Sequence, residues 1–277
     1  MVQKMAKKVI WMCNVVKRYL LRDTNYFFLS IYRYFQNNYH NNCKFYTEKE
    51  LTNLIRSGKS IIRIGDGEIG LVHFCNAAYQ VYSDAIRNDF LKIIKNYNND
   101  SLYVIGITEF VNYTNTELKN FVNTEGNKIN RFPVWRQLKI TYEMIFNREA
   151  KYFDALAFYK KGGFERIVLP CIKNKKVIII TNKENKEAII ASPLSSNTYL
   201  YVTCKNENAY ENRMKIEQDI INLIHTSGLP KSDFVILFAA GLAKTIIHDM
   251  SGQGYQVLDI GWGLKSYYTG IIIENLI

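Results

Sequence analysis

Short apolar runs alternate with helically spaced apolar positions along most of this chain. The runs predict buried strands, at Ser60–Ile64, Leu102–Ile107, Val177–Thr181, Tyr199–Thr203, Val235–Ala239 and Gln256–Ile260. Between them apolar residues recur with a helical period, as in Ile86, Phe90, Ile93 and Ile94. Strands that alternate with helices predict an α/β fold of the Rossmann-like kind, with a mostly parallel sheet and helices on both faces.

Local signals mark where several of these helices begin and end. The segment from Thr47 to Glu50 is a capping box, which starts a helix that ends at Gly58. Asp84 is expected to cap the next helix. Residues 134–161 have a mostly helical pattern, and residues 209–227 predict a helix that ends at Gly228 and Pro230. A further short helix is expected from about Ala243 to Met250.

The first 45 residues differ from the rest and predict an N-terminal helical arm, with the main domain at residues 46–277. An apolar face extends from Val9 to Leu20, with basic residues largely on the opposite side. A second stretch, Tyr26–Phe35, is crowded with aromatic residues. Two interpretations stay open: a pair of helices that packs on the domain, or an interfacial helix on an anionic membrane with Trp11 near the headgroups.

Composition excludes several classes of protein. The 277 residues are 48% hydrophobic and 22% charged, which is globular and excludes disorder, collagen and coiled coil as the main architecture. The five cysteines form no CxxC pair, and no apolar run approaches the roughly 20 residues that span a bilayer. No signal peptide is expected. These features predict a cytoplasmic protein, and a membrane-binding arm would make it peripheral on the inner face of the membrane.

The net charge of +11 favours anionic partners, which include nucleic acid, an anionic membrane surface and phosphorylated substrates. Charge alone does not choose among them. The chain has no zinc-finger spacing and no aromatic signature of an RNA-recognition sheet. Nucleic acid is therefore the least favoured of these partners.

The segment Arg63-Ile64-Gly65-Asp66-Gly67-Glu68 carries the strongest chemical signal. It lies where a buried strand ends and a helix is expected, and open α/β sheets bind ligands outside the carboxyl ends of their strands. Gly65 and Gly67 allow a tight turn and a close approach of the backbone. Asp66 and Glu68 suit a hard divalent cation, Mn²⁺ or Mg²⁺, that keeps positions open for phosphate oxygens. Arg63 is a candidate phosphate contact.

A plainer interpretation of this segment is a Gly-Asp-Gly turn with a solvated acidic tip. An Asp-x-Glu pattern by itself is very common, and only its place after a buried strand favours a site. The two interpretations differ in whether Asp66 and Glu68 converge on one point.

Several motifs together resemble the GT-D type glycosyltransferases, once a family of unknown function. The resemblance covers roughly residues 45–268 and is most specific in its first and last blocks. The blocks are Ile62–Glu68, Tyr79-Gln80, Ser83-Asp84, Phe132–Trp135, Asn147-Arg148, Asn208–Tyr210, Ala240–Lys244 and Gly254–Gly261. Two departures stand out, because the chain has Trp262 where the family often has His, and Gly241-Leu242-Ala243 replaces the usual Gly-Pro-Thr turn.

The resemblance implies a metal-dependent glycosyltransferase that uses a nucleotide-diphosphate sugar, such as a UDP-sugar. It implies that Asp66 and Glu68 bind the metal and the nucleotide. It implies a glycan or lipid-linked acceptor in bacterial surface-polysaccharide or glycoprotein biosynthesis, and a lipid-linked acceptor would fit the basic arm. The competing hypothesis is a basic nucleic-acid-binding protein or a non-catalytic nucleotide-binding scaffold.

Three further side chains are candidates for the site. Asp259 ends the last predicted strand, so in a parallel sheet it reaches the same edge as Asp66. It is a candidate base or sugar ligand, although a turn or cap aspartate fits the pattern equally well. Glu109 follows the strand at Leu102–Ile107 and is a weaker candidate base. Arg148 is a candidate phosphate clamp, with a surface ion pair as the alternative.

Overall fold

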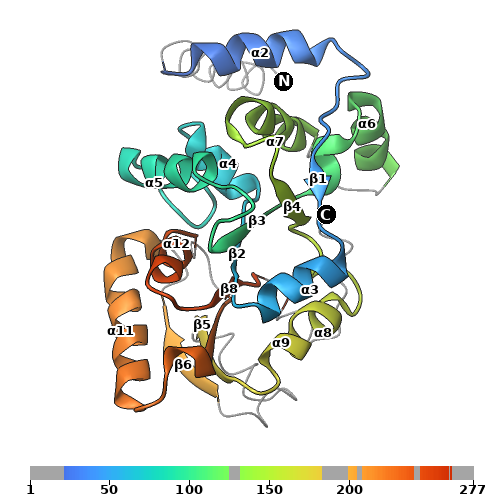
Figure 1. The fold of residues 1–277 in the computed structure, drawn as a ribbon. Helices are drawn as coiled ribbons and strands as arrows, with labels where there is room; N and C mark the ends of the chain where they lie inside the picture. The colour runs from blue at the N-terminus through green and yellow to red at the C-terminus, as the bar shows by residue number, and fades with distance from the viewer. Residues whose placement is uncertain are drawn as a thin grey trace.

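The computed structural model describes residues 22–124, 132–182, 199–204, 208–239, 244–261 and 263. Its strands form one eight-stranded sheet in the order β1-β4-β3-β2-β8-β7-β5-β6, and every paired neighbour is parallel (Figure 1). The strands are β1 (Lys44–Phe45), β2 (Ser60–Arg63), β3 (Tyr103–Ile107), β4 (Lys151–Asp154), β5 (Lys176–Thr181), β6 (Tyr199–Thr203), β7 (Phe234–Phe238) and β8 (Val257–Asp259). This confirms the predicted α/β class with a parallel sheet.

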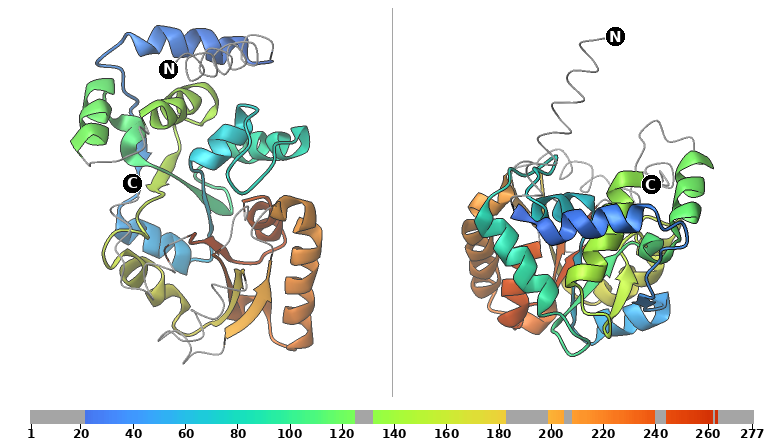
Figure 2. Two further views of the ribbon diagram at one scale, coloured as in Figure 1. Left: turned by 180° about the vertical axis from the view of Figure 1, so that it is seen from behind. Right: turned by 90° about the horizontal axis from the view of Figure 1, so that it is seen from above.

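Helices cover both faces of this sheet (Figure 1; Figure 2). On one side α3 packs with α8 and α9, and on the other α12 packs with β2, β8, α5 and α11. The α-helices are α2 (Thr24–Tyr34), α3 (Glu48–Arg56), α4 (Asp66–Val72), α5 (Asp84–Lys95), α6 (Asn115–Thr124), α7 (Phe132–Ile145), α8 (Gly163–Ile167), α9 (Leu169–Ile172), α11 (Arg213–Thr226) and α12 (Lys244–Gly252). Short 3₁₀ turns occupy Glu109–Asn112, Ala209–Asn212 and Lys231–Asp233.

The continuous apolar runs become the central strands because both of their faces are covered. Every residue of β3 and β7 is buried, as is all of β8. A strand buried on both faces needs apolar residues at consecutive positions rather than at alternate ones. The predicted runs at β2, β3, β5, β6, β7 and β8 are therefore confirmed within a residue or two at each end.

The start of α3 follows the predicted capping box. The Thr47 hydroxyl accepts a hydrogen bond from the Glu50 N–H, and the Glu50 carboxylate accepts one from the Thr47 N–H. At α5 the cap is Ser83 rather than Asp84, since the Ser83 hydroxyl accepts from the Ile86 N–H and Asp84 is the first helical residue.

The prediction of a mostly helical segment at residues 134–161 is wrong in its second half. Helix α7 ends at Ile145, and Lys151–Asp154 then form β4, which pairs with β3 and with β1. Only Tyr152 and Phe153 of β4 are buried. An apolar pair between two polar residues is too short to show the period of a strand.

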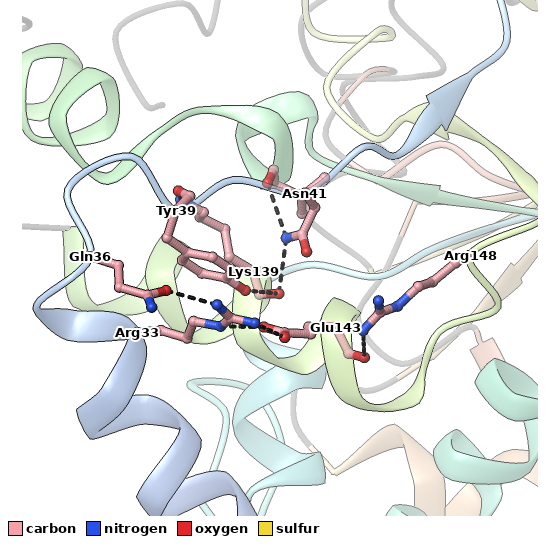
Figure 3. A network of polar contacts seen from close by, with 8 residues as sticks. Arg33, Gln36, Tyr39, Asn41, Lys139, Glu143 and Arg148 are labelled. Atoms are coloured by element: carbon pink, nitrogen blue, oxygen red, sulfur yellow. Dashed lines mark hydrogen bonds and ion pairs between the residues drawn. The ribbon is translucent and has the colours of Figure 1, made fainter.

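The described part of the N-terminal arm packs on the domain. Helix α2 lies across α7, and the Arg33 guanidinium forms an ion pair with Glu143 of α7 (Figure 3). The Lys139 ammonium, also on α7, donates to the Tyr39 carbonyl at 2.7 Å. Lys44 and Phe45, which the sequence assigned to the arm, join the sheet as β1. The packing interpretation therefore holds for residues 22–45.

Some sequence predictions fall outside the described residues. These are the apolar face from Val9 to Leu20, the Gly241-Leu242-Ala243 turn and Trp262. Over the ranges that the structure does describe, none of the helices is both long and apolar enough to cross a membrane.

Candidate active site

Three neighbouring strands deliver charged side chains to one edge of the sheet. Strand β8 lies between β2 and β7, and all three are parallel, so their carboxyl ends meet. Glu68 follows β2, Asp259 ends β8, and Lys244 begins the helix that comes after β7. This is the edge at which α/β sheets bind ligands.

Lys244 joins the two carboxylates. Its ammonium lies 3.0 Å from Glu68 Oε1 and 3.1 Å from Asp259 Oδ2. All three side chains are buried, with exposed fractions of 7% for Lys244, 5% for Glu68 and 1% for Asp259. Burial would lower the pKa of Lys244, but Asp259 and Glu68 raise it, so the ammonium stays charged.

Glu68 is held from two further directions. Its Oε2 accepts a hydrogen bond of 2.8 Å from the Gly65 N–H, and its Oε1 accepts one from the Tyr79 hydroxyl. Burial would raise the pKa of this carboxyl, but Lys244 and these hydrogen bonds lower it. Because a cation and two hydrogen-bond donors surround it, the buried carboxyl group of Glu68 stays ionised.

Arg63 closes the other side of the cluster. Its backbone N–H donates to Asp259 Oδ2 at 3.2 Å, and its Nε lies 3.8 Å from Asp259 Oδ1. The guanidinium stacks 4.6 Å from the centre of the Tyr159 ring and donates to the Tyr159 hydroxyl. Burial would lower the pKa of Arg63, but Tyr159 and Asp259 raise it. Arg63 therefore braces Asp259 from within the fold.

Two glycines let the backbone approach this cluster closely. A Cβ on Gly67 would lie 2.5 Å from the Tyr79 hydroxyl. Gly261 has a φ of +47°, and a Cβ there would lie 2.6 Å from the Arg63 guanidinium. Any other residue at either position would displace a side chain that contacts a charged group of the cluster.

Asp66 and Glu68 do not form a matched pair. Asp66 is exposed, and its carboxylate accepts only a local hydrogen bond of 3.0 Å, from the Gly67 N–H, among the contacts described. The interpretation of this segment as a turn with a solvated acidic tip therefore holds for Asp66 and not for Glu68. The reason is that the first turn of α4 directs Glu68 inward, toward Lys244.

The residues do not fit a metal site that uses both carboxylates. Both oxygens of Glu68 already have partners, and one of these is the Lys244 cation, which a metal would have to displace. Over the described residues, no group of three or more His, Cys, Asp or Glu side chains gathers where it could bind a metal. Asp66 is the carboxylate of this pair that is available to a cation.

Glu109 lies at the same edge of the sheet, one strand further along. It follows β3, and its carboxylate lies 3.7 Å from the Lys160 ammonium. Lys160 also contacts Asp154, at the end of β4, at 2.8 Å. Glu109 is about half exposed, with 46% of its side chain accessible, so it can reach a bound molecule.

Arg148 is separated from this group. It lies between α7 and β4, before the amino end of β4, whereas the other candidates follow the carboxyl ends of their strands. Its guanidinium donates to the Glu143 carbonyl at 2.8 Å (Figure 3). The predicted phosphate clamp thus lies at the opposite edge of a parallel sheet and acts as a local cap of α7.

Sequence reasoning did not single out Lys244, Tyr79 or Tyr159 as site residues. Tyr79 and Lys244 stand in motif blocks that carry the resemblance, but nothing around them shows that they point inward. Their partners come from distant parts of the chain. A lysine in the turn after the fifth predicted strand was the one available signal, because that turn lies at the same sheet edge as Asp66.

Two of the weaker motif blocks contact each other. The Asn208 N–H donates to the Tyr79 carbonyl at 2.9 Å, and the Asn208 side chain accepts from the Val81 N–H at 3.0 Å. Asn208 has a φ of +52°, a conformation that asparagine tolerates better than most residues. The block at Asn208 thus holds the segment that carries Tyr79 over Glu68.

Comparison with known proteins identifies the class to which this fold and site belong. Residues 61–269 match the family model of the glycosyltransferase GT-D fold. That match covers most of the 277 residues, so the chain belongs to the GT-D glycosyltransferase family. The family assignment favours an enzyme over the scaffold or nucleic-acid-binding alternative.

Solved structures show the same fold. A glycosyltransferase from Streptococcus sanguinis, of domain of unknown function 1792, is 18% identical with a TM-score of 0.63, over 83% of this chain and 86% of that one. A second structure, of that domain with selenomethionine, is 17% identical with a TM-score of 0.62, over 89% and 87%. A third, described as having a distinct glycosyltransferase fold, is 19% identical with a TM-score of 0.60, over 83% of each chain. No curated protein matches the chain significantly.

Proposed function

We propose that this protein transfers a sugar from a nucleotide-diphosphate donor, a UDP-sugar, to a glycan or lipid-linked acceptor. The observation that carries the proposal is the cluster of Glu68, Lys244 and Asp259 at the carboxyl edge of β2 and β8, with the exposed Asp66 beside it. The donor would lie outside these strand ends. The family assignment supports a nucleotide sugar as the donor class.

The charged side chains at this edge have different roles in this proposal. Glu68 and Asp259 hold Lys244, Asp259 also contacts Arg63, and Glu68 fixes the turn that begins at Gly65. Asp259 acts by positioning, because it is 1% exposed and contacts both cations. Glu109, which is exposed, is the better candidate base for the acceptor hydroxyl.

The reaction needs charge stabilisation where the diphosphate leaves. The acceptor hydroxyl attacks the anomeric carbon, the bond to the diphosphate oxygen breaks, and negative charge grows on that oxygen. A divalent cation, Mn²⁺ or Mg²⁺, would neutralise that charge when bound. We propose that Asp66 alone among the protein carboxylates contacts a cation carried by the donor, since such cations often use one carboxylate and several phosphate oxygens.

A thermal-shift panel of nucleotide sugars, with and without Mn²⁺, tests the donor class. A ligand at about 100 times its dissociation constant adds about 2.7 kcal/mol to the free energy of unfolding. We expect one UDP-sugar to raise the melting temperature of the wild type, and Asp66→Asn to remove the part of the shift that needs Mn²⁺. Asp84→Asn is the matched control, because Asp84 is also exposed in the first turn of a helix. Equal shifts in both variants would contradict the role of Asp66.

We also propose a peripheral location on the inner face of the cell membrane, where a lipid-linked acceptor of surface-polysaccharide or glycoprotein biosynthesis would be available. The support is the net charge of +11 and the basic character of the arm. Incubation with candidate lipid-linked acceptors and the donor that the panel selects would test this acceptor class. Hydrolysis of the donor by water alone would leave no glycosylated acceptor.

A further inference from the structure

The outward face of α2 is an apolar stripe. Phe28, Ile31, Tyr32 and Phe35, at the end of the helix, are 60%, 45%, 60% and 77% exposed. Their spacing of three, four and seven residues puts them on one side of a helix. Large apolar side chains gathered in this way mark an interaction surface, whereas single ones are ordinary.

The opposite side of α2 is fixed to the domain, so the helix cannot turn its stripe inward. Tyr26 is buried against His73, with ring centres 3.9 Å apart, and Arg33 forms an ion pair with Glu143. Ser30 accepts a hydrogen bond of 3.0 Å from Arg136 of α7. Figures 1 and 2 show α2 as the outermost described helix at this end of the molecule.

Outside α2, whose Tyr34 is also 48% exposed, the exposed large apolar residues of the described chain do not form such a group. Val81, Leu102, Met214 and Leu229 are 54%, 59%, 75% and 36% exposed, and each belongs to a different element or loop. Met214 on α11 is the closest single match to Phe35 in exposure. The stripe on α2 is thus a local feature and not a general property of this surface.

We propose that this stripe docks the protein on the surface of an anionic lipid bilayer. Residues 1–45 carry eight basic residues and one acidic residue, a net charge of +7 out of +11 for the chain. An excess of cationic charge in the sequence of this segment, together with the exposed aromatic stripe of α2, suits an interfacial helix on anionic lipid. A second copy of the chain is the poorer occupant, because two chains that each carry a net charge of +11 repel each other.

The docking surface is connected to the candidate active site by one short helix. Helix α4 begins at Asp66 and ends at Val72, and the next residue, His73, contacts Asp23 at the start of α2. Seven helical residues span about 10 Å. Docking through α2 would therefore keep the edge of the sheet near the bilayer, which serves a lipid-linked acceptor; this consequence rests on the proposed function, whereas the docking does not.

Co-sedimentation of the full-length protein with vesicles tests the proposal. One set contains phosphatidylcholine alone, and the other contains phosphatidylcholine with phosphatidylglycerol. We expect the wild type to bind the anionic vesicles and to bind less at high salt. The double variant Phe28→Ser with Phe35→Ser should reduce that binding by more than about tenfold, because each substitution removes a phenyl group that the bilayer would bury. Met214→Ser should bind like the wild type.

The other occupants of the stripe give different results. Equal binding of the double variant and the wild type to anionic vesicles would overturn the proposal. So would a wild-type dimer in analytical ultracentrifugation that the double variant converts to a monomer, or an absence of vesicle binding at low salt. Nucleotide-sugar binding should be the same in the double variant and the wild type, so a wrong donor class and a wrong docking surface are separate outcomes.

Discussion

Two buried lysines show how differently this chain can accommodate a cation. Lys139, in α7, is fully buried and donates to the carbonyls of Tyr39 and Tyr113 and to the side-chain oxygen of Asn115. Lys244 is equally enclosed but is held by the carboxylates of Glu68 and Asp259. One cation has neutral oxygens around it and the other has ionised ones.

The difference distinguishes a cation that ties structural elements together from one that lies at the candidate active site. Burial lowers the pKa of Lys139 to about 8, whereas the carboxylates beside Lys244 raise its pKa. Lys139 ties the chain before β1 and the start of α6 to α7. Its partners are backbone carbonyls and one side-chain amide, which are neutral. The partners of Lys244 lie next to an exposed carboxylate at the ligand-binding edge of the sheet, where charge balance can respond to a bound anion.

Removing the lysine charge should lower the free energy of unfolding by different amounts in the two regions. Lys244→Met leaves two buried carboxylates without their cation, and we expect a loss of about 3–5 kcal/mol in the free energy of unfolding. Lys139→Met leaves neutral oxygens unsatisfied, and we expect a smaller loss of about 1–3 kcal/mol. Urea unfolding followed by circular dichroism measures both.

A matched rescue sharpens this first comparison. Adding Glu68→Gln to Lys244→Met removes one uncompensated charge and should recover part of the lost stability. No similar rescue exists for Lys139. An unchanged free energy of unfolding in Lys244→Met would mean that its ion pairs with Glu68 and Asp259 contribute nothing to stability. That result would contradict two ionised carboxylates buried beside Lys244.

Asp66 and Glu68 should also differ in how much each contributes to the free energy of unfolding. Glu68→Gln weakens the hold on Lys244 and should cost about 1–3 kcal/mol. Asp66→Asn changes an exposed group and should stay within about 0.5 kcal/mol of the wild type. The same unfolding experiment compares them, and equal losses would restore the view that both side chains lie on one solvated turn.

How much of this the sequence predicts depends on the range of the signal. The central strands and the turn after β2 follow from local pattern, because burial on both faces demands continuous apolar runs. Strand β4 does not, since only Tyr152 and Phe153 are buried in it. The two-residue strand β1 has no readable period, and its pairing with β4 comes from tertiary structure.

The candidate site also has features that follow from local sequence and features that depend on distant residues. That Asp66 and Asp259 reach one edge follows from parallel strands, and the geometry agrees, because Lys244 contacts both Glu68 and Asp259. The inward direction of Glu68 could not be predicted, because it depends on a lysine far along the chain. The edge of the sheet at which Arg148 lies could not be assigned, because the strand that follows it, β4, was not predicted.

The stability of the interface between α2 and the domain should depend on pH through His73. His73 contacts Asp23 at 3.2 Å and Thr141 at 2.7 Å, and Tyr26 lies on its ring. Burial lowers its pKa below 6.5, an effect that Arg87 adds to and Asp23 opposes. Since the unfolded chain then binds a proton first, stability is full above about pH 6.5 and falls as the pH decreases below it.

The slope of that pH dependence is the measurable quantity. One proton gives at most about 1.4 kcal/mol per pH unit. We expect His73→Gln to remove the part of the wild-type decrease between about pH 6.5 and the lower folded-state pKa. Asp23, whose pKa is also lowered, loses its contribution only below its unfolded value of 3.8. Parallel stability curves for the two proteins from neutral pH to about pH 5 would contradict this account.

The smallest effect is expected at Arg148, and it tests the assignment of the two sheet edges. Arg148 precedes β4 and caps a carbonyl of α7, whereas Arg63 ends β2 and contacts Asp259. Arg148→Ala should change the free energy of unfolding by less than about 0.5 kcal/mol, as exposed substitutions usually do. It should leave the donor-induced thermal shift unchanged, because no phosphate at the carboxyl edge can reach it. Arg63→Lys is the contrasting variant, since an ammonium cannot reproduce the stacking on Tyr159, and it should weaken the donor-induced shift. A donor shift that is lost in Arg148→Ala and kept in Arg63→Lys would place the ligand at the amino edge, away from Asp66.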